Sequence, residues 1–174
     1  MKILDTERLT LRTLDSGDAP FYLELVNQPS FLQYIGDKGV RTLDDARRAI
    51  ADGPQAMQRE RGHSLYLVQR RSDGAPLGLC GLIKRDSLPD VDIGYALMPA
   101  YWGQGYAHEA AAAVLAHGRD VVGLKRLLAI TSPENQSSIG LLLKLGLRFV
   151  EFTHLPPDQR ATNIYRLEFA AAAG

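Results

Sequence analysis

The stretch that decides the fold reads Tyr101-Trp102-Gly103-Gln104-Gly105-Tyr106-Ala107-His108-Glu109-Ala110. It joins a predicted strand, residues 91–98, to an alanine-rich helix that we expect to run to about Val122. Glycine lets consecutive amide N–H groups point into one concavity. A helix start adds unpaired donors and the positive end of the helix dipole. The stretch therefore predicts a phosphate-binding loop, with a tight strand-to-helix turn as the alternative.

Two widespread phosphate-loop motifs do not fit this stretch. A P-loop needs Gly-Lys followed by Ser or Thr, which is absent. A dinucleotide fingerprint needs a third glycine at the position of His108. Such a fingerprint also opens a βαβ unit, whereas this stretch follows several predicted antiparallel strands. A nucleotide-dependent oxidoreductase is therefore disfavoured.

A second segment, residues 131–149, predicts a helix with a defined start and end. Asn135 fits an N-cap with Ser138 one turn on, and Gly146 fits a left-handed stop. The apolar side chains recur at helical spacing and indicate one buried face, made by Ile139, Leu142 and Leu143. Capping alone would also account for Asn135.

The rest of the chain indicates one α/β domain over residues 1–174, with residues 170–174 frayed. Alternating or continuous apolar runs predict strands, at residues 8–14, 65–68, 77–83, 91–98, 127–131, 148–153 and 163–169. Thr42 begins a predicted helix with a capping box, which we expect Gly53-Pro54 to interrupt. Gly94 predicts a bulge in the central strand, residues 91–98.

Composition excludes several classes of partner. The chain has 20 basic and 20 acidic residues and a formal net charge of zero, so we expect neither nucleic acid nor an anionic membrane as partner, with a local basic groove as the alternative. Its single cysteine, Cys80, excludes an internal disulfide or a multi-thiolate zinc site, and no histidine spacing predicts another metal site. The longest apolar run, Ala110 to Ala116, is far shorter than the roughly 20 residues of a membrane span. We expect a cytoplasmic protein.

Together these segments resemble the GCN5-related N-acetyltransferase (GNAT) superfamily. Asp92-Ile93-Gly94-Tyr95-Ala96-Leu97 looks like its central strand, and residues 101–110 look like its acetyl-CoA loop and helix. Asn135-x-x-Ser138 followed by Lys144-Leu145-Gly146-Leu147 looks like its second signature. The opening residues 6–12 are similar to the ribosomal-protein N-terminal acetyltransferase (RimJ/RimL-like) branch. The resemblance covers residues 6 to 169.

The resemblance implies a mixed, mostly antiparallel sheet flanked by helices, with acetyl-CoA as cosubstrate and no metal. The central strands should splay after Leu97, so that the pantetheine arm lies between residues 91–98 and 127–131. A homodimer is compatible with it. The implied cofactor-binding residues are Ala96, Leu97, Trp102, Gly103, Gln104, Gly105, Tyr106, Ala107, Asn135 and Ser138.

The implied catalytic residues are Asp92 and Ser138. Asp92 occupies the family's frequent Glu position with a shorter side chain, so it would act as general base through water. Asp90, or water alone, remains the alternative base. Ser138 would hydrogen-bond the thiolate leaving group, and a backbone N–H near Ala96 or Leu97 would bind the thioester oxygen. Leu142 stands where many members place a tyrosine acid.

The predicted reaction is direct transfer of acetyl from acetyl-CoA to an amine, without Cys80 as nucleophile. A peptide or protein α-amine is the expected acceptor, because it demands less deprotonation than lysine. We expect residues 154–160 to wall the acceptor site. The alternatives are a small-amine or polyamine acetyltransferase and a non-catalytic acyl-CoA-binding protein on the same fold.

Overall fold

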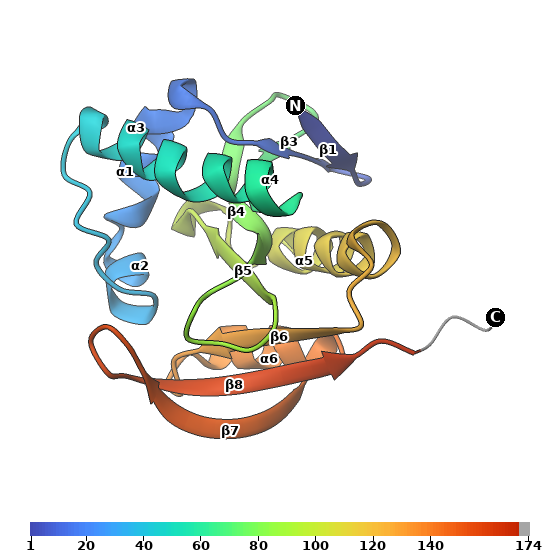
Figure 1. Cartoon of the computed structure of the whole chain (residues 1–174). Helices are drawn as coiled ribbons and strands as arrows, with labels where there is room; N and C mark the ends of the chain where they lie inside the picture. Colours follow the sequence, from blue (N-terminus) through green and yellow to red (C-terminus); the bar gives the residue numbers. More distant parts are fainter. Residues whose placement is uncertain (171–174) are drawn as a thin grey trace.

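The computed structural model describes residues 1–170, and its framework is one eight-stranded sheet (Figure 1). The strand order is β1-β2-β3-β4-β5-β6-β8-β7, and β5–β6 is the one parallel pair among the neighbours in that order. The strands are β1 (Lys2–Asp5), β2 (Leu9–Thr13), β3 (Leu65–Arg70), β4 (Pro76–Ile83), β5 (Asp92–Leu97), β6 (Arg126–Thr131), β7 (Arg148–Leu155) and β8 (Arg160–Glu168). The expected mixed, mostly antiparallel sheet is confirmed. The short β1 was not predicted, and the predicted frayed tail lies mainly in residues 171–174, outside the described part.

Helices cover both faces of this sheet. They are α1 (Ala19–Val26), α2 (Pro29–Tyr34), α3 (Leu43–Ile50), α4 (Ala56–Arg61), α5 (Tyr106–His117) and α6 (Gln136–Lys144). One buried cluster joins α1, α2 and α3 to Leu67 and Leu79 of the sheet. A second joins α5 and α6 to the opposite side chains of β2 to β6, such as Ile93. Successive side chains of a strand point to opposite faces of the sheet, and each face is covered by its own layer of helices.

The central strands β5 and β6 part much earlier than expected. Their register contains the single pair Asp92↔Leu128, supported by a 2.9 Å hydrogen bond from the Leu128 amide to the Val91 carbonyl. Beyond that pair, β5 continues beside β4 up to Leu97, while β6 continues beside β8 up to Thr131. The prediction of a splay after Leu97 is wrong in position: each strand keeps its outer neighbour, and the gap opens from Ile93 onward.

Two local predictions are also corrected. Gly94 forms no bulge against β4, because the β4–β5 register runs without a shift from Gly78↔Leu97 to Ile83↔Asp92. Pro54 does not interrupt the helix that starts with the Thr42 capping box. The backbone continues from α3 to α4 through a π-helical turn, Ala51–Gln55, whose wider winding accommodates the proline.

Candidate active site

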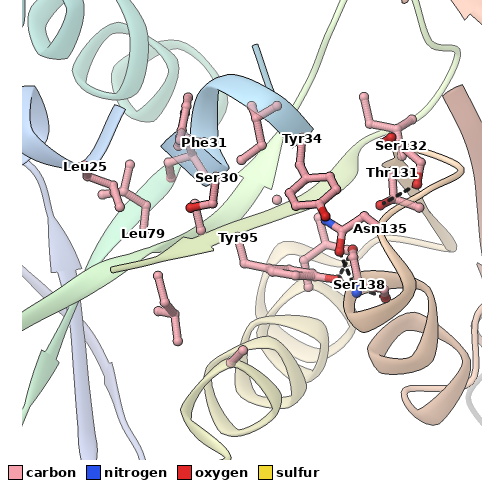
Figure 2. Close-up of a pocket in the computed structure, with 18 of the residues that line it drawn as sticks. Leu25, Ser30, Phe31, Tyr34, Leu79, Tyr95, Thr131, Ser132, Asn135 and Ser138 are labelled. Atoms are coloured by element: carbon pink, nitrogen blue, oxygen red, sulfur yellow. Dashed lines mark hydrogen bonds between the residues drawn. The ribbon is translucent and has the colours of Figure 1, made fainter. Parts of the chain in front are cut away.

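A cavity of about 790 Å³ opens where β5 and β6 diverge. Its walls come from α1, α2, β5, the loop before α5, the start of α6 and the start of β8. Figure 2 shows side chains from α2, β5 and α6 directed into this space. Most of the residues predicted from the sequence as functional lie on one continuous surface.

The loop before α5 forms a cradle of unpaired amides. Gly103 and Gly105 have φ angles of 75° and 81°, a left-handed conformation that favours glycine. Within residues 1–170, the amide N–H groups of residues 103–108 donate to no protein acceptor, and the first paired amide is that of Glu109, at 3.0 Å from the Gly105 carbonyl. Consecutive free N–H groups at a helix N-terminus suit a phosphate. The geometry fits the pyrophosphate of a CoA molecule.

An ion-pair network fixes this cradle to the start of β2. The Arg8 Nε donates to Glu109 Oε1 at 2.7 Å, the Arg8 amide donates to Glu109 Oε2 at 2.9 Å, and Thr6 Oγ1 donates to the same oxygen at 2.5 Å. Arg8 Nη1 also donates to the Gln104 carbonyl at 3.0 Å. The residues 6–12 that resemble one acetyltransferase branch therefore include the groups that hold the loop.

Not every predicted loop residue presents its side chain to the cavity. Trp102, Gly103, Gly105, Tyr106 and Ala107 line it, whereas Gln104 does not. The Tyr106 ring is buried beneath the Arg8 guanidinium, 4.3 Å from its centroid. Gln104 and Tyr106 therefore fit the cradle through their amides.

Ser138 and Tyr95 form a hydrogen-bonded pair across the cavity. Tyr95 Oη and Ser138 Oγ are 2.8 Å apart, and Asn135 Oδ1 accepts from the Ser138 amide at 3.2 Å, as its predicted N-cap role requires. Figure 2 shows Tyr95, from β5, reaching the first turn of α6. Burial raises the pKa of Tyr95 to about 12, so the phenol keeps its proton at neutral pH.

Asp92 is fully buried, and its carboxylate is paired with Arg85. Its carboxylate oxygens lie 3.1 and 3.3 Å from Arg85 Nε, and both residues line the cavity. Burial raises the pKa of Asp92 to about 6, and Arg85 opposes that rise. The carboxylate is therefore ionised at neutral pH yet is more basic than an exposed aspartate.

The other residues that could have taken a base, acid or nucleophile role are poorly placed for it. Asp90 lies outside the cavity lining and pairs with Arg126 at 3.8 Å. Leu142 is buried in the core and offers no proton. Cys80 is fully buried, which raises the pKa of its thiol, and it does not line the cavity. A buried neutral thiol is a poor nucleophile.

Neighbouring residues of β5 point their backbone amides to opposite sides of the strand, so the amides of Ala96 and Leu97 face different neighbours. The Met98 amide donates to the Leu77 carbonyl of β4, so the alternation turns the Ala96 amide toward β4 as well and the Leu97 amide toward the gap. The Leu97 carbonyl faces the gap too, where it accepts from Trp102 Nε1 at 3.0 Å. Of the two predicted amides, that of Leu97 faces the cavity.

Sequence reasoning missed several cavity residues. Tyr95, whose aromatic ring suits either a pocket wall or the core, was given no chemical role. Lys38, Arg85 and His108 also line the cavity. Of the loop 154–160 that we expected to wall the acceptor site, Arg160 alone is among the lining residues. These residues meet through tertiary contacts that no local pattern encodes.

The comparison with protein families decides the assignment. Residues 8–148 match the model described as an acetyltransferase (GNAT) domain. The chain belongs to the GNAT acetyltransferase family. It is an N-acetyltransferase, and the GNAT fold binds acetyl-CoA.

Individual relatives agree with that assignment. The chain is 28% identical to the uncharacterized N-acetyltransferase YoaA of Bacillus subtilis over 84% of this chain and 82% of the relative. It superposes on an acetyltransferase from Agrobacterium tumefaciens with a TM-score of 0.81 and 25% identity, covering 97% and 95% of the two chains. The ribosomal-protein α-N-acetyltransferase RimL, solved in complex with coenzyme A, shares the fold at 19% identity with a TM-score of 0.82 over 97% of this chain and 98% of that one.

Residues 1–170 contain neither a membrane-spanning helix nor a cluster of metal-binding side chains. Over residues 1–170, no helix is long and apolar enough to span a bilayer. Within the same described range, no cluster of three or more His, Cys, Asp or Glu side chains is arranged to hold a metal ion.

Proposed function

We propose that this N-acetyltransferase moves the acetyl group of acetyl-CoA directly onto the α-amine of a peptide or protein N-terminus. The observation that carries the proposal is the buried Asp92 on the wall of the cavity that also contains the amide cradle. A carboxylate with a pKa of about 6 is closer to an α-amine, near 8, than to a lysine, near 10.4. Deprotonating lysine would cost roughly 3 kcal/mol more.

Acetyl-CoA supplies an activated thioester, and the chain supplies its binding groups. The amides of residues 103–108 would hold the pyrophosphate. The gap between β5 and β6 would take the pantetheine arm, which can pair with the strand edges that the early divergence leaves open. The Leu97 amide would donate to the thioester oxygen as negative charge develops there.

Proton transfer would use two separate groups. Asp92 would accept the proton of the attacking amine, through water because its side chain is short and held by Arg85. The Ser138 hydroxyl, hydrogen-bonded to the Tyr95 phenol, would donate to the departing thiolate. Tyr95 comes from β5 and would supply the hydroxyl that Leu142 lacks on α6.

Removing these hydroxyls should slow the reaction moderately. A thiol has a pKa of about 8.5, so its thiolate leaves without full protonation. We expect Ser138→Ala and Tyr95→Phe each to lower kcat about tenfold, with little further loss in the double variant because the two act as one unit. Steady-state kinetics with a fixed peptide acceptor measures this. Additive losses of about a hundredfold in the double variant would contradict a shared relay.

The acceptor class can be tested directly with a panel of amines. The set contains short peptides with a free N-terminus, the same peptides N-blocked with one lysine, spermidine and an aminoglycoside. We expect the highest kcat/KM for the free N-termini, by about tenfold or more, because of the difference in amine pKa. A preference for spermidine or the aminoglycoside would refute the α-amine and favour a small-amine acetyltransferase.

A further inference from the structure

The side of the cavity next to α2 gathers positive charge. Lys38 follows α2, Arg85 follows β4, and Arg160 begins β8; all three line the cavity. The amide cradle lies at the start of α5 instead, so these cations border a different part of the cavity. In Figure 1 the turn before β8 lies beside α2, in agreement with a hydrogen bond from Arg160 Nη2 to the Gln33 carbonyl. We call Lys38, Arg85 and Arg160 the cation cluster.

The three cations are close enough to influence one another. Lys38 is an exposed residue, and its pKa is lowered, first because neighbouring protein atoms partly desolvate its ammonium and then because Arg85 and Arg160 repel it. Asp158 acts in the opposite direction. Like charges brought together without full compensation are unfavourable, so the arrangement calls for a counter-charge.

Contacts within the protein satisfy only some of the hydrogen-bond donors of the cation cluster. Arg85 pairs with Asp92 through Nε, and Arg160 binds the Gln33 carbonyl. Within residues 1–170, Lys38 Nζ takes part in no hydrogen bond or ion pair, and the terminal nitrogens of Arg85 donate to no protein acceptor. The other acid among the lining residues, Glu134, lies beside the start of α6. The α2 side of the cavity therefore has unused donors and a positive excess.

We propose that the cation cluster binds a carboxylate of the acceptor, so that the preferred substrate is an amine with a carboxylate close to it. This specificity rests on the proposed function, because it describes the acceptor of the same reaction. A carboxylate would accept from Lys38 and from the free Arg85 nitrogens, and the attached amine would then lie near Asp92. The same charges would repel polyamines. The carboxylate can belong to an Asp or Glu side chain near a peptide N-terminus or to a free amino acid.

The test compares acceptors that differ in charge alone. We would measure kcat/KM for C-terminally amidated peptides with Glu, Gln or Lys at the second and third positions, and for glutamate beside its uncharged diamide. We expect the Glu peptides to exceed the Gln peptides about tenfold and the Lys peptides by more, with the difference shrinking as salt rises from about 0.05 to 0.5 M. The peptide and amino-acid arms separate the two sources of carboxylate.

Variants of Lys38 connect that preference to the cation cluster. Lys38→Gln should reduce the Glu-over-Gln ratio about threefold or more, Lys38→Arg should retain it, and the affinity for acetyl-CoA should stay unchanged in both. Lys125→Gln is the matched control, because Lys125 is exposed, as Lys38 is, but lies outside the cavity lining. An unaltered ratio in Lys38→Gln would overturn the proposal.

A binding measurement separates this proposal from the proposed function. Calorimetry of the CoA complex with N-acetylated Glu and Gln peptides needs no turnover. Tighter binding of the acetylated Glu peptide, lost in Lys38→Gln, would support the cation cluster even if α-amines proved poor acceptors. Equal binding and equal kcat/KM for the two peptides would refute the cluster while leaving N-terminal acetylation intact.

Discussion

Replacing Gly105 by glutamate is expected to abolish measurable acetyl-CoA binding, a loss of at least about a hundredfold in affinity. Gly105 has a φ of 81°, where a side chain costs roughly 1–2 kcal/mol, and a Cβ there would lie 3.3 Å from Arg8 Nη2. The new carboxylate would stand beside the free amides of residues 103–108, where the pyrophosphate should bind. Isothermal calorimetry measures the affinity, and circular dichroism verifies that the variant is folded.

Gly74→Glu provides the matched control for the backbone penalty. Gly74 has a similar φ of 74°, lies in the turn between β3 and β4, and has no atom within 4 Å of an added Cβ. It should lose comparable stability and keep its affinity for acetyl-CoA. Wild-type affinity in folded Gly105→Glu would show that the cradle does not hold the cosubstrate.

The strands and the two signature segments were predictable because their signals are local. Alternating or continuous runs of apolar side chains located β2, β4, β5, β6 and the β7–β8 pair, and Asn135 and Gly146 marked the ends of α6 through their own backbone geometry. The positive φ angles at Gly103 and Gly105 follow from the same kind of signal. Such features depend on a few consecutive residues, so a single sequence contains them.

The position of the splay and the partners of the site residues were not predictable in this way. Whether β5 and β6 part at Asp92 or at Leu97 depends on where β4 and β8 hold them, which involves strands far apart in the chain. Pairing of Tyr95 with Ser138 depends on how α6 packs against β5. Lys38, Arg85 and Arg160 come from three distant segments, and a chain with zero formal net charge gives no indication that they meet.

The buried ion pair at Asp92 leads to a second large effect, on both rate and stability. We expect Asp92→Asn to lower kcat/KM about a hundredfold between roughly pH 6.5 and 8, where Asp92 is ionised and the α-amine is still mostly protonated. The wild type should show an acid limb with an apparent pKa near 6, the value to which burial raises Asp92, and the variant should lack it. Asp90→Asn removes the same charge from the partly exposed pair with Arg126 and should behave as wild type.

As the pH rises through 6, the rate of the wild type should increase, whereas its stability should fall. Because the pKa of folded Asp92 is raised from 3.8 to about 6, the fold favours the protonated carboxyl, and this contribution is present below pH 4 and is lost as the pH rises through 6. The asparagine cannot ionise, so relative to Asp92→Asn the wild type should lose up to about 3 kcal/mol between roughly pH 4 and 7.5. Urea unfolding of both proteins at the two pH values measures the difference. A rate loss that is equal at every pH, together with a stability difference that does not change with pH, would assign Asp92 a positioning role through Arg85 and leave water as the base.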